Sequence, residues 1–314
     1  MPKNRELVIE FLNNALVEGA RIPPEDQIFF YKGVSYPAAV CNPDTFKALE
    51  SFEARMDDII LAGYPKTGTN WLDHILNNLE NTAAKYTEEE MKKIMNLEKE
   101  LEVTPRLEFG DPDKFQRMKK LPSRRIIITH LSPHSLPSSV FKNKAKILVL
   151  IRNPKDTLVS YYHFINTVGV FPPSTWDDHF ANFMDGTVAW GSYFDYVAEW
   201  DKYIDDKNII AISYEELKEN LNEYLKKIAE FLGFSLNEEE IQTIVDKSTF
   251  TAMKQKASET HGAFGDILFR KGSVGDWKSM LSESQNKEMD RRFEECLSRT
   301  KLGAKIKYDF YCKI

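Results

Sequence analysis

Apolar residues along the middle of the chain occur in short continuous runs rather than alternating with polar ones. The runs fall within residues 59–62, 125–128, 146–151 and 208–212. Strands that are buried on both faces have this pattern. Apolar residues at helical spacing follow in residues 156–168 and 221–232, and Gly233 then provides a typical helix C-cap. Strands that alternate with helices predict an α/β fold with a central parallel sheet flanked by helices.

Two further segments have patterns of their own. Residues 7–16 place apolar residues at a rough helical spacing, which indicates a packing helix within an N-terminal lead-in of residues 1–35. Residues 81–107 mix acidic and basic clusters with scattered apolar residues, and we expect a charged, mobile helical excursion there. Because no linker rich in proline, glycine or serine divides the chain, we expect a single domain over residues 1–314.

A loop of small residues joins the first apolar run to a helix. It reads Tyr-Pro-Lys-Thr-Gly-Thr-Asn-Trp over residues 64–71. A helix N-terminus that follows such a loop presents backbone N–H groups and a positive dipole end, which suits a phosphate-like anion, and Lys66 adds a full charge. The nucleotide-triphosphate loop G-x-x-x-x-G-K-[ST] places its lysine after the second glycine, whereas Lys66 precedes Gly68. The loop therefore predicts an anion site of another layout.

Each of the four predicted strands leads into a polar side chain. These side chains are Lys66, His130, Arg152 and Tyr214. Open parallel sheets bind ligands at the carboxyl ends of their strands. We therefore expect the four side chains to share one site.

Composition excludes several classes of protein. Apolar residues make up 42% of the chain, which is ample for a packed core. The net charge of −6 argues against broad nucleic-acid binding. No apolar run approaches the roughly 20 residues of a membrane span, and the first residues lack a signal-peptide pattern. Three cysteines without a framework spacing favour reduced thiols, so we expect a cytoplasmic protein with no membrane partner. They are Cys41, Cys296 and Cys312.

Two motifs carry a resemblance to a known family. The first is Pro-Lys-x-Gly-Thr-x-Trp at residues 65–71, and the second is Arg-Lys-Gly-Ser-Val-Gly-Asp-Trp-Lys at residues 270–278. They resemble the phosphosulfate-binding loop and the 3′-phosphate signature of the cytosolic sulfotransferases, and the chain looks most similar to the vertebrate 6B type. The similarity runs from about residue 36 to the end of the sequence. It implies transfer of a sulfuryl group from 3′-phosphoadenosine 5′-phosphosulfate (PAPS) to the hydroxyl of a small acceptor, without a metal.

The resemblance also implies roles for individual residues. His130, within Thr-His-Leu, would be the general base, and Lys66 would stabilise the leaving group. Arg152 and Ser160 would bind the 3′-phosphate. Phe164 and Val168 would line the acceptor side. The other cofactor contacts would be Thr67, Gly68, Thr69, Asn70, Trp71, Tyr214, Ser248, Phe250, Arg270, Lys271 and Gly272.

The chain departs from the family pattern in two places. Many phenol-sulfating relatives carry lysine two residues before the catalytic histidine, where this chain has Ile128, which predicts slow transfer or an unusual acceptor. The family's dimer motif, K-x-x-x-T-V-x-x-x-E, would need Thr, Val and Glu where the chain has Ser282, Glu283 and Lys287. We therefore expect a monomer, or a weak dimer through another surface.

The identity of the acceptor stays open at this point. The resemblance permits phenols, thyroid-hormone-like phenols and steroids, and we expect a phenolic compound. Because of Ile128, a cofactor- or hormone-binding protein with little catalysis is an alternative, which product formation would exclude. A nucleotide kinase is a further alternative, which magnesium-dependent turnover would indicate.

Overall fold

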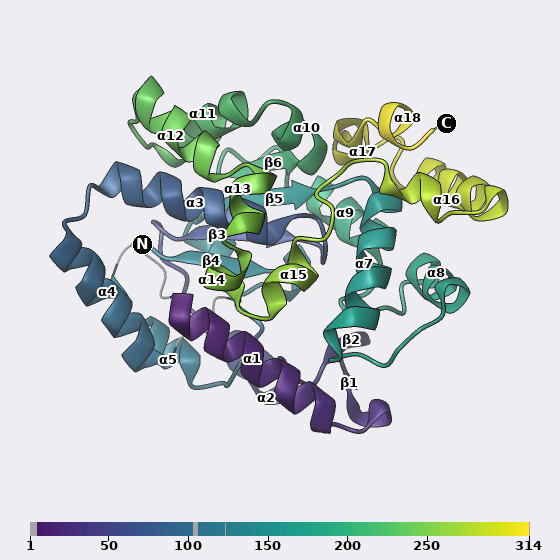
Figure 1. Ribbon diagram of the computed structural model, residues 1–314, viewed down its shortest axis with the longest axis horizontal. Helices are drawn as coiled ribbons and strands as arrows, with labels where there is room; N and C mark the ends of the chain where they lie inside the picture. Colours follow the sequence, from purple (N-terminus) through teal and green to yellow (C-terminus); the bar gives the residue numbers. More distant parts are fainter. Residues whose placement is uncertain (1–4, 103–105, 123, 314) are drawn as a thin grey trace.

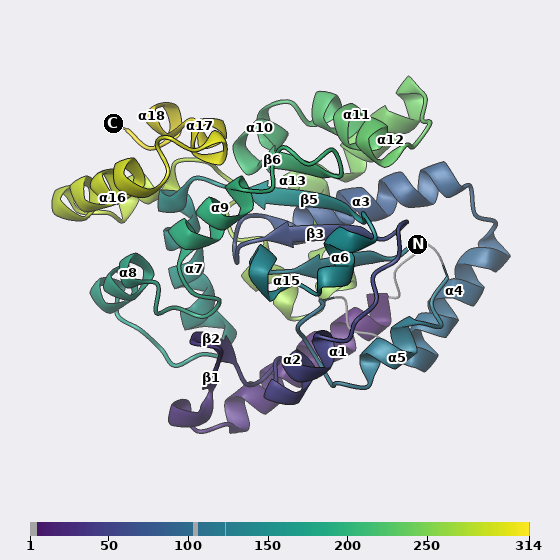
Figure 2. The same cartoon turned by 180° about the vertical axis from the view of Figure 1, so that it is seen from behind.

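The computed structural model describes residues 5–102, 106–122 and 124–313. A four-stranded parallel sheet lies at its centre, in the order β4-β3-β5-β6, and helices enclose it in both views of the fold (Figures 1 and 2). Each strand coincides with one of the predicted apolar runs to within two residues. The predicted α/β fold with a central parallel sheet is therefore confirmed. The strands are β3 (Ile59–Gly63), β4 (Ile126–Thr129), β5 (Lys146–Ile151) and β6 (Ile209–Ser213).

Both faces of this sheet are buried, which explains why its strands are continuously apolar. Successive side chains of a strand point to opposite faces. Leu61 and Leu148 therefore pack into one hydrophobic cluster, whereas Ile60 and Ile147 pack into another. The first cluster includes residues of α3 (Thr69–Ala84), α10 (Tyr214–Glu219), α11 (Leu221–Leu232) and α12 (Glu238–Lys247). The second includes residues of α2 (Pro43–Leu49), α7 (Pro154–Val168), α8 (Trp176–Asp185), α9 (Tyr193–Asp201), α16 (Glu283–Cys296) and α17 (Lys301–Ile306).

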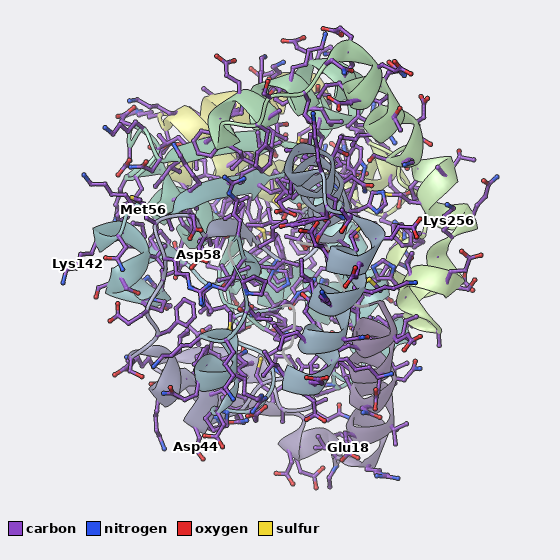
Figure 3. All side chains as sticks on the ribbon, turned by 90° about the vertical axis from the view of Figure 1, so that its left-hand side faces the viewer. Glu18, Asp44, Met56, Asp58, Lys142 and Lys256 are labelled. Atoms are coloured by element: carbon purple, nitrogen blue, oxygen red, sulfur yellow. The ribbon has the colours of Figure 1, made fainter. Side chains whose placement is uncertain are left out.

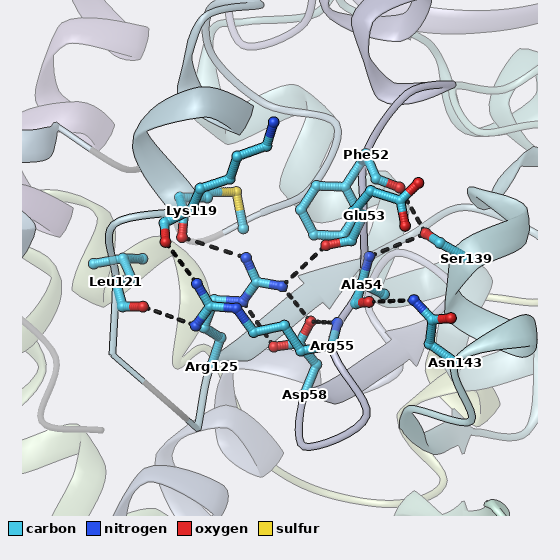
Figure 4. Close-up of polar contacts among 11 residues, drawn as sticks. Phe52, Glu53, Ala54, Arg55, Asp58, Lys119, Leu121, Arg125, Ser139 and Asn143 are labelled. Atoms are coloured by element: carbon cyan, nitrogen blue, oxygen red, sulfur yellow. Dashed lines mark hydrogen bonds and ion pairs between the residues drawn. The ribbon is translucent and has the colours of Figure 1, made fainter.

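A buried ion pair aligns the two strands that carry the anion loop and the histidine. Asp58 directly precedes β3 and Arg125 directly precedes β4, and neither side chain is more than 2% exposed. Arg125 donates from Nε and Nη2 to the two carboxylate oxygens of Asp58, at 2.7 and 2.5 Å (Figure 4). The pair fixes Ile59 opposite Ile126 at the amino ends of the strands. The carboxyl ends, Gly63 and His130, consequently lie side by side.

The N-terminal lead-in forms more structure than the sequence pattern indicated. Helix α1 (Arg5–Arg21) extends the predicted helix at both ends and packs on α14 (Ala257–His261) and α15 (Phe264–Leu268) (Figure 1). Strands β1 (Ile28–Tyr31) and β2 (Val34–Pro37) then form an antiparallel hairpin that we did not predict. Four-residue strands are too short for a clear alternation, although Lys32 and Gly33, both with positive φ, mark the turn between them.

The charged segment is helical where the structure describes it. Helix α3 ends at Ala84, and α4 (Glu88–Leu101) begins with a capping box in which Thr87 and Glu90 cap each other's backbone N–H groups. Lys99 of α4 pairs with Glu6 of α1 at 3.0 Å, which connects the two helices. Residues 103–105 of the segment lie outside the described part. Its mobility stays a prediction.

Shorter elements complete the fold. Gly233 ends α11 with a φ of 73°, as predicted. Side chains such as Glu18, Asp44, Lys142 and Lys256 project from the outside of the molecule (Figure 3). None of the helices in the described ranges has the length and apolar character that a membrane span requires. The remaining helices are η1 (Pro24–Asp26), α5 (Lys114–Met118), η2 (Pro133–Ser135), α6 (Ser138–Lys142), α13 (Phe250–Gln255), η3 (Asp276–Ser279) and α18 (Tyr308–Tyr311).

Candidate active site

The loop between β3 and α3 has the geometry of an anion seat. Lys66 and Gly68 both adopt positive φ angles, 71° and 105°, and α3 begins at Thr69. Only glycine fits at Gly68, because a Cβ there would lie 2.8 Å from Cδ2 of Tyr214 in a backbone conformation that L residues rarely adopt. Gly68 has no side chain to cap α3, so the positive end of the helix dipole is left to a ligand.

A cavity of about 790 Å³ lies at the carboxyl ends of the strands. The four predicted strand-end residues all line it, so the structure places them in one site as the pattern predicted. Predicted residues from the anion loop and the start of α3, from α7, from Phe250 and from the second motif also line it. The lining includes Lys66, Gly68, Thr69, Asn70, Trp71, His130, Arg152, Ser160, Phe164, Tyr214, Phe250, Arg270, Lys271 and Gly272.

Three predicted residues lie just outside the lining. Thr67 is buried and donates its hydroxyl to the carbonyl of Tyr64 at 2.7 Å, so it supports the loop from behind. Val168 is buried in a hydrophobic cluster with Phe171, and Phe171 itself lines the cavity. Ser248 accepts the indole N–H of Trp71 on its backbone carbonyl at 2.7 Å, and this bond holds the tryptophan at the cavity wall.

Positive charge is concentrated around Lys66. Burial and the nearby cations Arg152, Arg270 and Arg106 lower the pKa of Lys66 to about 7. Its ammonium lies 4.1 Å from the centre of the Phe164 ring. Like charges that are buried close together raise the free energy of the protein unless an anion binds among them. The site is therefore built for a ligand with several negative charges.

Buried polar atoms mark where such a ligand would bind. Nε of Arg152 and Oγ of Ser248 are buried and have no hydrogen-bond partner among the described residues. Native structures rarely leave buried donors unpaired, and Arg152 lines the cavity, so its Nε suits an anionic ligand there, whereas Ser248 lies outside the lining. Arg152 also donates to the carbonyls of Lys66 and Ser273, at 3.1 and 3.3 Å, and stacks on Tyr214.

The second motif brings two cations and a close backbone approach to the same end of the cavity. Arg270 and Lys271 both pair with Asp276, the latter at 2.5 Å. A phosphate at this position would compete with Asp276 for them. At Gly272 a Cβ would overlap the Phe250 ring, so glycine lets the backbone reach the aromatic wall.

His130 is held in a defined orientation and tautomer. Its Nδ1 lies 2.6 Å from the carbonyl oxygen of Gly63, which can only accept, so Nδ1 carries the proton and Nε2 carries a lone pair. Its backbone N–H donates to the buried Glu108 carboxylate at 2.9 Å. Burial and the charge of Arg106 lower the pKa of the imidazole to about 3. The side chain is a neutral, weak base that faces the cavity.

Comparison with known proteins identifies the family. Residues 56–301 match the family model described as the sulfotransferase domain. The chain belongs to the sulfotransferase family. The human protein named sulfotransferase 6B1 is 51% identical over 306 residues, covering 97% of each chain, and the zebrafish protein of that name is 42% identical over 303 residues, covering 96% of this chain and 99% of its own. The resemblance to the 6B type is thus confirmed.

Solved structures agree with this assignment. A crystal structure of mouse sulfotransferase SULT7A1 complexed with PAP is 32% identical and covers 92% of this chain and 99% of its own, with a TM-score of 0.80. The predicted class of enzyme, a sulfotransferase that uses PAPS, is confirmed, and the nucleotide-kinase alternative is dropped. Among the described residues of this sulfotransferase, no group of three or more histidine, cysteine or carboxylate side chains could hold a metal ion.

The sulfotransferase cavity also contains residues that sequence reasoning missed. Its apolar wall includes Val8, Phe11 and Leu12 of α1, so the N-terminal helix forms part of the site rather than only packing against it. Phe109 and Trp190 extend the same wall. The helical spacing in α1 did identify the apolar stripe, but its partner is the cavity, which the sequence pattern alone does not reveal.

Arg106 is the most consequential of the missed residues. Its Nε donates to Nε2 of His130 at 3.3 Å, and its Nη2 donates to Oδ1 of Asn70 at 2.8 Å. Arg106 belongs to no strand and joins the sheet through a single backbone bridge to Ile128. Its sequence position, at the end of the charged segment, gave no signal that it would reach the base.

Proposed function

We propose that this sulfotransferase transfers the sulfuryl group of PAPS to the hydroxyl of an apolar phenol, with His130 as the general base and Lys66 as the cation at the leaving group. The contact between Nδ1 of His130 and the carbonyl of Gly63 supports this proposal most directly. It turns the basic Nε2 toward the cavity, at the end of the strand next to the anion loop. PAPS supplies the activated sulfuryl group, and the protein binds the donor, orients the acceptor and accepts its proton.

The donor would be held mainly through its anionic ends. Arg152, Arg270 and Lys271, which line the cavity together with Ser160, would receive the 3′-phosphate. The loop from Lys66 to Asn70 would receive the phosphosulfate at the start of α3. Trp71 and Phe250 also line the cavity and would wall the adenine.

The weakness of His130 as a base favours a phenol over an aliphatic alcohol. A base whose pKa lies well below neutrality removes a proton more readily from the more acidic of two hydroxyls, and a phenol has a pKa of about 10, well below that of an alkanol. The apolar wall of Phe11, Phe109, Trp190 and Phe171 suits an aromatic acceptor. A thyroid-hormone-like phenol fits this description and stays a specific candidate.

One observation favours a second candidate function. Arg106 donates to Nε2 of His130, which occupies the lone pair that the acceptor hydroxyl must use. If this contact persists with ligands bound, the protein would bind its cofactor and a hormone-like phenol with little catalysis.

Transfer of radiolabelled sulfate from PAPS to a panel of acceptors tests the proposal. The panel pairs each phenol with its cyclohexanol counterpart of similar size, and includes iodothyronines and steroid alcohols. We expect labelled product from phenols at a rate at least tenfold above their paired alcohols. Binding of PAP without product from any acceptor would instead support the binding function, and equal rates within pairs would contradict the phenol assignment.

A further inference from the structure

Arg106 links His130 to the anion loop, since it contacts both His130 and Asn70. No residue predicted from the sequence was assigned to this place. The guanidinium of Arg106 contacts His130 Nε2 on one side and Asn70, at the first turn of α3, on the other. The sulfuryl group of a donor seated in the loop has to pass between the loop and the base. The guanidinium therefore lies where the group in transfer would lie.

The backbone of Arg106 and Leu107 is held by contacts with β4 and Lys114. Arg106 bridges Ile128 of β4, and the N–H of Leu107 donates to the carbonyl of Ile128 at 2.8 Å. The ammonium of Lys114, which is fully buried, donates to the carbonyl of Arg106 at 2.9 Å and also to that of Phe109. The guanidinium lies 5.4 Å from the Phe109 ring, against the apolar wall.

Strand β4 supplies no charge at this point. Ile128 is apolar and 1% exposed; it packs in a hydrophobic cluster with residues of α3 and α11, and it also borders the cavity. Arg106, its bridge partner, brings a cation to the same end of β4 from outside the strand.

We propose that Arg106 is a catalytic residue of the sulfuryl transfer described above, on which this inference rests, and that its guanidinium contacts the sulfuryl oxygens as the group moves to the acceptor. The acceptor hydroxyl takes the place of Arg106 at Nε2 and gives its proton to His130. The new bond between the acceptor oxygen and sulfur forms while the bond from sulfur to the bridging oxygen breaks, and that oxygen leaves with the electron pair on the 5′-phosphate. Arg106 exchanges no proton.

A guanidinium suits this task for two reasons. It presents several N–H donors in a fixed plane, so it can stay bonded to Asn70 while it donates to a sulfuryl oxygen. It also stays protonated beside Lys66, whose own pKa is lowered to about 7. A preorganised donor aimed at developing charge typically contributes a hundredfold or more in rate.

Equilibrium binding without any acceptor provides a test that does not depend on turnover. The affinities of PAPS and PAP are measured for the wild type, Arg106→Ala and Arg106→Lys. PAPS differs from PAP by the sulfuryl group, so the ratio of the two affinities reports contacts with that group. We expect Arg106→Ala to lower the ratio of PAPS affinity to PAP affinity by roughly tenfold or more, the loss typical of a charged hydrogen bond. The affinity for PAP itself should stay within severalfold of the wild type. Arg106→Lys should keep part of the preference. An unchanged ratio in Arg106→Ala would overturn the proposal.

Arg117→Ala is a matched control, because Arg117 contacts Asp111 and the carbonyl of Leu101 near the same segment but does not line the cavity. It should leave the ratio unchanged. An equal loss in this variant would mean that Arg106 acts only by ordering the segment.

Turnover gives a second readout in a protein that transfers sulfate. Arg106→Ala should lower kcat about a hundredfold. The charged groups near His130 are Arg106, Lys66 and the Glu108 carboxylate. Because the charge of Arg106 lowers the pKa of His130, Arg106→Ala should raise that pKa and move the acidic limb of the pH profile to higher pH. A rate above that of the wild type would show that Arg106 only blocks the base. Absence of product with any acceptor would count against the proposed function alone, since the binding ratio would still test Arg106.

Discussion

Nδ1 of His130 and the carbonyl oxygen of Gly63 are 2.6 Å apart and join the ends of β4 and β3. The contact follows from the register of the two strands, in which Ala62 lies opposite Thr129. The acceptor is the carbonyl of Gly63, the last residue of β3, which leads into the anion loop. One hydrogen bond therefore sets the distance between base and loop and also selects the tautomer that leaves Nε2 free of a proton.

Replacing His130 with alanine should abolish transfer while leaving the affinity for PAP within severalfold, because Nε2 acts on the acceptor proton. Steady-state sulfation and calorimetric binding of PAP provide the two readouts. Turnover near that of the wild type would refute the role of His130. A large loss of PAP binding would indicate that the variant has disturbed Gly63 and the loop.

Lys66 should make donor binding depend on pH. Its pKa is lowered to about 7 in the free protein by burial and neighbouring cations, so it is mostly neutral at pH 8. An anionic ligand favours the charged form and raises this pKa. Binding of PAP at pH 8 should thus take up a proton at Lys66, and affinity should fall as pH rises above 7.

Calorimetry in two buffers of different ionisation enthalpy measures that proton uptake. Lys66→Met is the control, and the difference between wild type and variant removes the contribution of the ligand's own phosphates. Equal proton uptake by both proteins would contradict the assignment.

Arg152 should contribute more to donor affinity than Lys271. Arg152 is buried with an unpaired Nε, whereas the Lys271 side chain is 52% exposed and already pairs with Asp276. Arg152→Ala should weaken PAP binding by about 2–3 kcal/mol, the upper range for a charged hydrogen bond, and Lys271→Ala by less. The measurement is repeated with adenosine 5′-phosphosulfate, which lacks the 3′-phosphate. Losses of the same size with that ligand would refute a 3′-phosphate site.

The limits of sequence reasoning are clearest at Arg106 and helix α1. Periodicity located β3 to β6, because strands with two buried faces are apolar along most of their length, and the strand-end rule then found Lys66 and His130. Arg106 escaped because its place depends on one long-range bridge, which no spacing rule encodes. The same holds for α1, whose apolar stripe was visible although the cavity it faces was not.

Ile128 occupies the position at which many phenol-sulfating relatives carry lysine, and Arg106 forms a backbone bridge with it. Ile128 is buried at the cavity, and a lysine there would add a third cation to Arg106 and Lys66. Ile128→Lys should lower both the melting temperature and turnover, since a buried charge without a partner is costly. The double variant Ile128→Lys, Arg106→Ala should recover part of both. Higher phenol sulfation by well-folded Ile128→Lys would show instead that Arg106 does not replace the positive charge that relatives carry at position 128.

Oligomeric state can be tested on helix α16. Ser282 caps this helix by accepting the N–H of Gln285, and the exposed side chains of Glu283 and Lys287 pair with each other at 2.6 Å. In a two-fold contact each charge occurs twice, and burying the pair at an interface would cost more than it gains. The wild type should therefore scatter light as a monomer at micromolar concentration.

Restoring the family motif should convert the monomer into a dimer. The triple variant Ser282→Thr, Glu283→Val, Lys287→Glu keeps a capping hydroxyl and adds an apolar side chain, and we expect it to form a dimer at micromolar concentration. Glu295→Val is the control, because Glu295 forms an equivalent exposed pair with Arg291 on the same helix at 2.6 Å but lies outside the motif. It should remain monomeric, which would show that the motif rather than added apolar surface drives association. A wild-type dimer that Glu283→Arg dissociates would contradict the prediction, because it would place Glu283 in an existing interface despite its charge.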